Sequence, residues 1–214
     1  MRRMFSALLD TSVLWPSTQR DFLLSLAAEN VYRPLWSDAI LEELEAHEAL
    51  KLVDRGRANP QEAADRASRL VEEMRAGFDD ASVIGWEGLV GTYGLPDRDD
   101  EHVVAAAVVG NAGAIVTNNL RHFPPALIPS GIEVLSAQDF LTSQVSLNPV
   151  AGVRAVREIS SRSGRRGPTR SVVDILSHLE RTYQLVDAAA LMRQHIDDPR
   201  GGDAAAARQS GGTT

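Results

Sequence analysis

The sequence predicts an α/β domain with a mostly parallel central sheet and helices on both faces, followed by a small all-helical C-terminal extension. Segments of helical length alternate with short apolar stretches, and such alternation is typical of a parallel sheet. The apolar stretches have the length of buried strands and lie at residues 5–9, 31–36, 114–116 and 132–135. Beyond residue 145 the patterns are helical only.

Composition divides the 214 residues into three predicted parts. The α/β domain is expected at 1–145 and the helical extension at 146–196. The tail at 197–214 is rich in Gly, Ala, Ser and Thr, lacks material for a core, and is predicted to be disordered. Cysteine is absent, which excludes disulfides, thiolate zinc sites and a cysteine nucleophile.

The charge and apolar patterns bear on location and partners. No apolar run approaches the roughly 18 residues of a membrane span. The first apolar stretch ends at Asp10, too early for the core of a secretory signal. We therefore expect a cytoplasmic protein without a membrane partner. The net charge is −7, yet arginines outnumber acidic residues beyond position 150.

The first predicted strand, 5–9, ends at Asp10, Thr11 and Ser12. In open parallel sheets, ligands bind outside the carboxyl ends of strands, so Asp10 is well placed for chemistry. The alternative is that Asp10 only caps a turn. A helix is predicted around 21–28, after this turn.

A helix capped by Ser37 and Asp38 is predicted to run to about residue 53. At 100° per residue, Glu43 lies on the flank of its apolar stripe, whereas Glu42 points nearly opposite. Glu43 is therefore the glutamate that can face a neighbouring element. His47 follows at i+4; it could orient Glu43 or touch substrate, and the alternative is an exposed pair with Glu43.

An acidic cluster precedes the small apolar helix that starts at Glu101. Asp97, Asp99 and Asp100 form this cluster with Glu101. A helix dipole favours such charges by about 0.3–1 kcal/mol each, but four acids in five positions repel one another by more than capping requires. A divalent cation would relieve the repulsion, and helix capping in water is the alternative.

The strand at 114–116 ends at Thr117 and Asn119, again polar residues at a strand's carboxyl end. Elements before it are a scaffold helix at 61–78 and a short strand at 83–84. The extension is predicted to hold helices at 148–160 and 171–183 and a third that ends near residue 195. Its arginines are candidate phosphate contacts, or else solvated surface: Arg162, Arg165, Arg166 and Arg170.

The aromatic and histidine residues suggest no further site in the sequence. Trp15, Trp36 and Trp86 are isolated from one another and predict core or interface positions, not a base-stacking platform. The five histidines are scattered and do not have the spacing of a zinc site.

Three segments, ALLDTSVL, SDAILEEL and LPDRDDEHVVAAAVVGNAGAIVTNNLRHFP, resemble the motifs of PIN-domain nucleases, in the branch that includes VapC-type toxins. The resemblance covers about residues 4–142. The helical extension to about residue 195 is similar to one found on some of these toxins. The resemblance therefore implies a PIN-like fold for the first domain.

The resemblance also implies roles for residues. Asp10, Glu43 and Asp100 would be the catalytic, metal-binding carboxylates for Mg²⁺ or Mn²⁺, both of which prefer oxygen ligands. The supporting residues implied by position are Asp97, Thr11, Ser12, Thr117 and Asn119. Many relatives have Asp where this chain has Asn119, and an acid where it has His122. Because Asn119 brings no charge, one or two bound ions both remain open.

The function implied is a metal-dependent endoribonuclease that hydrolyses RNA phosphodiester bonds, the toxin of a type II toxin–antitoxin pair. Its expected partners are RNA, a cognate antitoxin that covers the groove, and a second copy in a PIN–PIN homodimer. One alternative is a catalytically weakened PIN-like module that binds RNA or a protein partner. An aspartate-based phosphatase is disfavoured because Ser12 stands where that chemistry needs a second acid.

Overall fold

The computed structural model describes residues 4–164 and 168–198, which form two compact units. The first unit comprises the chain up to residue 17 together with 33–137. The second comprises 18–32 together with the chain from residue 138. The domain limits at 145 and 196 remain predictions, and residues 199–214 of the predicted tail lie outside the described residues.

The first unit contains a five-stranded sheet in the order β3-β2-β1-β4-β5. Every neighbouring pair is parallel. The strands are β1 (Ser6–Leu9), β2 (Arg33–Ser37), β3 (Ser82–Val83), β4 (Ala114–Val116) and β5 (Glu133–Leu135). The predicted parallel sheet is confirmed, and its strands end at one common edge, with β1 in the centre.

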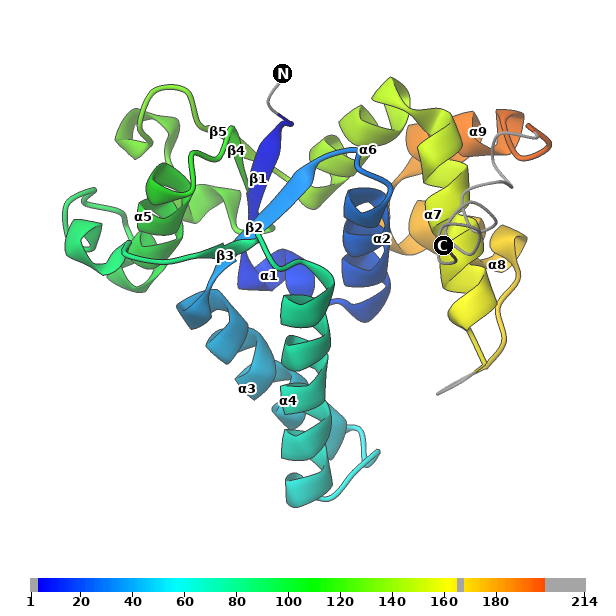
Figure 1. Ribbon diagram of the computed structural model, residues 1–214, viewed down its shortest axis with the longest axis horizontal. Coiled ribbons are helices and arrows are strands. Elements are labelled where there is room, and N and C mark those ends of the chain that lie inside the picture. The colour runs from blue at the N-terminus through cyan, green and yellow to red at the C-terminus, as the bar shows by residue number, and fades with distance from the viewer. Residues whose placement is uncertain (1–3, 165–167, 199–214) are drawn as a thin grey trace, which may run out of the picture. The chain divides into compact units, whose positions relative to one another are not determined.

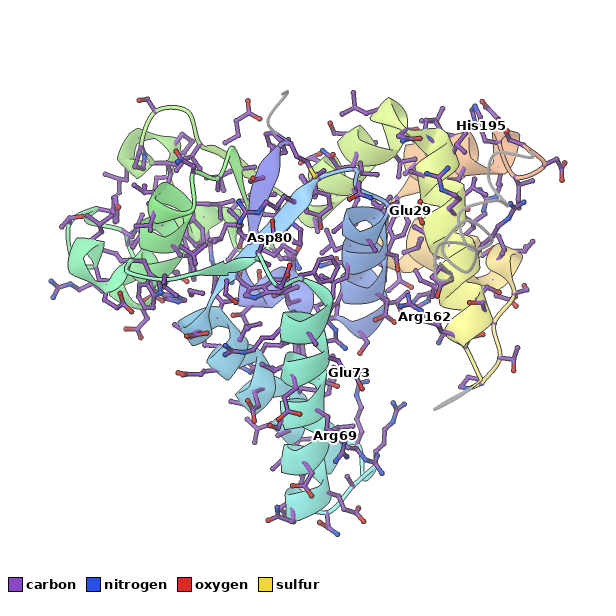
Figure 2. The ribbon with its side chains drawn as sticks, viewed as in Figure 1. Glu29, Arg69, Glu73, Asp80, Arg162 and His195 are labelled. Carbon is purple, nitrogen blue, oxygen red and sulfur yellow. The ribbon has the colours of Figure 1, made fainter. Side chains whose placement is uncertain are left out.

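Four α-helices and four short 3₁₀ helices complete the first unit. The α-helices are α1 (Thr11–Leu14), α3 (Asp38–Asp54), α4 (Pro60–Gly77) and α5 (Glu101–Val109). The 3₁₀ helices are η1 (Glu87–Leu89), η2 (Arg98–Asp100), η3 (Leu120–His122) and η4 (Pro125–Leu127). The helices α3 and α4 lie side by side, and Arg69 and Glu73 mark the course of α4 (Figures 1 and 2).

Local sequence explains where these helices begin. Ser37 caps α3, where its side chain accepts a hydrogen bond from Ile40 N at 3.3 Å. Asn59 and Glu62 form a capping box at the start of α4. The single turn α1 was not predicted as a helix. Asp10 is its N-cap residue, but the carboxylate makes no capping bond and is available to other partners.

The helix α5 is largely buried, with residues 103–107 fully inaccessible. Its small side chains allow close packing against the sheet. At its end, a Cβ on Gly110 would lie 2.9 Å from Val83 and 3.0 Å from Leu35, so only glycine fits without a shift. Tight packing here fixes the position of the helix start, where the acidic cluster lies.

Glu101 holds the loop that leads into this helix. The side chain is buried and accepts hydrogen bonds from the backbone N–H of Tyr93, Gly94 and Leu95, at 3.4, 2.8 and 3.3 Å. Burial raises the pKa of Glu101, but these donors outweigh burial and the net pKa is lowered. Glu101 is thus a structural carboxylate, unlike the other acids of the cluster.

The second unit is helical. It contains α2 (Ser17–Ala28) from residue 18 onward, α6 (Ala137–Leu147) from residue 138 onward, α7 (Pro149–Arg162), α8 (Val172–Tyr183) and α9 (Val186–Gln194). Ser171 and Asp174 form a capping box at the start of α8. The helical extension is confirmed, and the early helix α2 belongs with it.

Polar and aromatic contacts tie α2 and its following turn to the later helices. Arg154 on α7 pairs with Glu29 at 2.6 Å, and Tyr32 meets Phe140 edge to face at 4.8 Å between ring centroids. Figure 2 labels Glu29 at the end of α2 and Arg162 at the end of α7. Across residues 4–164 and 168–198, no helix combines the length and apolarity needed to cross a membrane.

Candidate active site

Asp10 lies at the carboxyl end of the central strand β1 and is only 5% exposed. Two hydroxyls donate hydrogen bonds to the same carboxylate oxygen, Oδ2: Ser12 Oγ at 2.6 Å and Thr117 Oγ1 at 2.7 Å. Thr117 follows β4, the neighbouring strand, so the adjacency of β1 and β4 creates this contact. The structure thus brings Asp10 together with residues that follow β4.

Glu43 reaches the same region from α3. Thr11 Oγ1 lies 2.6 Å from Glu43 Oε2, and His102 Nε2 lies 3.1 Å from Oε1. Partial burial raises the pKa of Glu43, but the hydrogen bonds from His102 and Thr11 outweigh burial and lower it overall. Glu43 is therefore held as a carboxylate anion with both oxygens oriented.

Asp100 ends η2, at the entrance to α5. Its Oδ2 lies 2.7 Å from Nδ1 of His122. Arg121 Nε donates to His122 Nε2 at 3.3 Å, so Nε2 is the acceptor and Nδ1 the donor toward Asp100. Asp97 joins Asp100 and His122 in a group whose ligand atoms all lie within 4.8 Å of one another.

Burial raises the pKa of Asp100 above its ordinary value. His122 opposes this shift through its hydrogen bond, whereas the negative charges of Asp10 and Asp97 reinforce it. These two carboxylates are thus close enough to disfavour the ionisation of Asp100. A cation placed among them would reverse that effect.

The turn after β4 is hydrogen-bonded to the residues around Asp10. Asn119 N donates to Thr117 Oγ1 at 3.0 Å, and Asn118 binds Ser12 twice, through its backbone N–H to Oγ and through its side-chain amide to the carbonyl, both at 2.9 Å. The Asn119 side chain is exposed and lines the pocket. Asn118 was not among the predicted site residues, because its neighbours from β1 are visible only in the fold.

One open pocket of about 270 Å³ collects these side chains. Its lining residues are Asp10, Thr11, Ser12, Trp15, Glu43, His47, Asp100 and Asn119. The predicted supporting residues Thr117 and Asp97 reach it indirectly, through Asp10 and Asp100 respectively. Trp15, His102 and His122 were not predicted from the sequence to take part in the site.

The four arginines that the sequence predicts as phosphate contacts belong to the second unit, and two of them lie outside the described residues. Arg162 and Arg170 are described, whereas Arg165 and Arg166 are not. Arg162 Nη2 lies 3.0 Å from Ser25 Oγ, and its Nε lies 3.6 Å from Glu158 Oε1.

The donor set fits a hard divalent cation. Carboxylate oxygens from three separate elements face one pocket, and Mg²⁺ and Mn²⁺ prefer such oxygens. Burial is the main cause of the raised pKa of Asp100, and the negative charges of Asp10 and Asp97 add to it, so a cation at this place would be favoured. The chemistry open to such a site is metal-assisted hydrolysis.

We predict that the pKa of Asp100 responds in opposite directions to changes at its two kinds of neighbour. Asp10→Asn removes a like charge and lowers this pKa, whereas His122→Leu removes a hydrogen-bond donor and raises it. Carboxyl ¹³C NMR titration of the metal-free protein measures both shifts. Glu42→Gln, on the exposed face of α3, is the control that leaves it unchanged, and a rise in Asp10→Asn would contradict the assignment.

Comparison with known proteins gives two family matches. A PIN-domain model matches residues 5–121, and a model of the VapC50 C-terminal domain matches residues 137–194. A curated relative, the putative ribonuclease VapC50 of Mycobacterium tuberculosis (strain ATCC 25618 / H37Rv), is 42% identical over 72 residues. The alignment covers 33% of this chain and 42% of the relative, so the chain spans less than half of that protein's length. No solved structure matches the chain significantly.

Proposed function

This chain belongs to the PIN-domain family and carries a VapC50-type C-terminal domain, and on that basis we propose that it is a metal-dependent endoribonuclease. The reaction is hydrolysis of RNA phosphodiester bonds. The observation that carries the proposal is that Asp10, Glu43 and Asp100 come from different elements yet line one pocket. The name of the relative, a putative ribonuclease, supports the same reaction class.

Asp10, Glu43 and Asp100 would hold Mg²⁺ or Mn²⁺. When bound, the ion supplies a water of lowered pKa and neutralises charge that builds on the phosphate. The hydroxyls of Ser12, Thr117 and Thr11 keep the first two carboxylates oriented for this task. Such partners of metal ligands typically change affinity or activity by about 10–100-fold when removed.

We propose different roles for Asn119 and His122. The Asn119 amide lines the pocket and can donate a hydrogen bond to a phosphate oxygen or to the attacking water. His122 donates to Asp100 and so acts as a positioning residue for that carboxylate. Neither side chain needs a negative charge for these roles, which accommodates the departure from the acids that many relatives have.

We also propose that the chain is the toxin of a type II pair, bound by an antitoxin over the pocket, and that it forms a homodimer through the PIN domain. The VapC50-type C-terminal domain supports the toxin assignment. The competing function is a PIN-like module that binds RNA or a protein without cleaving. The neutral Asn119 in the pocket is the observation that favours this competitor.

We predict that purified protein cleaves total RNA at discrete sites with Mg²⁺ or Mn²⁺, and that EDTA abolishes cleavage. Asp100→Asn should lower the cleavage rate by at least about 100-fold, because it removes a charged ligand of the site. Asp99→Asn is the matched control, since Asp99 is the exposed neighbour and does not line the pocket. Sequencing of the fragment ends gives the cut sites.

Equal rates for Asp100→Asn and wild type would contradict the metal-dependent mechanism. Undetectable cleavage by wild type, together with measurable Mn²⁺ binding, would favour the binding module.

The arginines of the extension are proposed to supply the basic surface that an acidic pocket lacks. Burial lowers the pKa of His178, and the positive charges of Arg170 and Arg181 lower it further, which marks this part of the second unit as electropositive. Because α2 shares this unit through contacts such as Glu29–Arg154, deleting the extension would also expose α2. Point substitutions therefore test the role more cleanly than truncation.

We predict that Arg162→Ala with Arg170→Ala flattens the dependence of RNA affinity on salt. For single strands the slope of log K against log salt should fall in magnitude by about 0.7 for each phosphate that the variant no longer neutralises. Arg193→Ala is the control, because Arg193 is paired with Glu180 at 2.5 Å. An unchanged slope in the double variant would remove these arginines from the RNA surface.

A further inference from the structure

Trp15 occupies an unusual position for a tryptophan in this chain. It directly follows α1 and lines the same pocket as Asp10 and Glu43. The side chain is 42% exposed, whereas Trp36 is completely buried, as predicted from the sequence. A large ring left in water beside carboxylates contributes little to the core, so its exposure needs another explanation.

The ring is held in place by its neighbours, with the Lys51 ammonium over one face, and it is still 42% exposed. Its single polar atom, Nε1, donates to the His47 carbonyl at 3.4 Å. The Trp15 carbonyl accepts from Lys51 Nζ at 3.1 Å, and the same ammonium lies 5.7 Å from the ring centroid. Because Nε1 is already bonded, the surface that Trp15 exposes is the carbon surface of the indole.

The charges around the ring favour an uncharged ligand over an anion. The Lys51 ammonium forms an ion pair with Glu48, so its charge is compensated within α3. The remaining acidic side chains of the pocket repel a phosphate that approaches without a metal ion. An aromatic surface attracts a planar ring by stacking, and that attraction does not depend on net charge.

We propose that Trp15 is a stacking platform for one unpaired nucleobase of single-stranded RNA, adjacent to the phosphate that the carboxylate site acts on. The inference rests on the proposed ribonuclease function and adds a base-binding subsite to it. The His47 ring, 6.3 Å from Trp15 and tilted by 59°, borders the same subsite. Since every base has a π face, this contact gives affinity with little sequence preference.

The position of Trp15 in the chain couples the subsite to the chemistry. One helical turn, α1, separates it from Asp10, and Thr11 and Ser12 within that turn hold the carboxylates. A base stacked on Trp15 therefore has a fixed offset from the metal-binding carboxylates. Stacking would place the neighbouring phosphodiester at the pocket and offset the repulsion that an acidic surface exerts on RNA.

The test measures binding of short single-stranded RNA oligonucleotides in which an abasic site is moved along the strand. An Asp100→Asn background prevents cleavage during the measurement. Trp15→Leu keeps an apolar side chain but removes the π face, and should weaken binding by about 5–150-fold, the range of base–aromatic stacking. Trp15→Phe keeps an aromatic ring and should retain most of the affinity.

Two further readouts separate stacking from a loss of packing. In the Trp15→Leu variant an abasic site should no longer weaken binding at any position, and the salt slope should match that of the parent. Ile84→Ala, which alters another exposed apolar residue of the first unit, is the control that leaves both unchanged. The abasic scan on the parent protein is informative without any Trp15 variant, because an abasic site at one position should weaken binding more than at the others.

Trp15→Leu with the affinity and base dependence of the parent would overturn the inference, as would a parent that binds abasic and intact strands equally. If the wild type still cleaves RNA in that case, only the base subsite fails and the proposed function stands. If the wild type does not cleave but Trp15→Leu loses binding, the subsite stands and the nuclease proposal fails.

Discussion

The mutual repulsion of carboxylates at one edge of a small parallel sheet is the constraint on which the site depends. Burial disfavours the charged form of Asp100 most strongly, and the charges of Asp10 and Asp97 add to this effect. Each carboxylate has a hydrogen-bonding partner that fixes an oxygen: two hydroxyls for Asp10, a hydroxyl and an imidazole for Glu43, and an imidazole for Asp100. These partners orient the acids but do not remove the excess negative charge, which a divalent cation would neutralise.

The strand order explains how one chain assembles such a site. With β1 between β2 and β4, the residues after β1 and β4 meet at the same edge, and the helix after β2 brings Glu43 beside Thr11. The entrance of α5 then places Asp100 at the pocket, and the buried Glu101 secures the preceding loop. In this fold the carboxyl edge of the sheet and the adjoining helices thus bring the carboxylates of Asp10, Glu43 and Asp100 to one pocket.

Sequence patterns were sufficient to predict those site residues whose positions follow from strand and helix periodicity. The position of Asp10 after a buried strand and the phase of Glu43 on its helix both predicted residues that the pocket contains. The partners His102 and His122 could not be assigned this way, because their contacts depend on which elements neighbour each other in space. The exposure of Trp15 was equally hidden, since isolation in sequence says nothing about what a side chain faces. For the same reason, the grouping of α2 with the C-terminal helices emerged only from the fold.

We propose that hydrogen bonds to the carboxylates preorganise a divalent metal site, and calorimetric titration with Mn²⁺ tests this proposal most directly. Thr117→Val removes one of the two hydroxyl donors to Asp10 Oδ2 with little change in volume, whereas Thr117→Ser keeps the hydroxyl. We predict that Thr117→Val weakens Mn²⁺ binding by about 10–100-fold and that Thr117→Ser binds nearly as tightly as wild type. Equal Mn²⁺ affinity for wild type and Thr117→Val would contradict this claim.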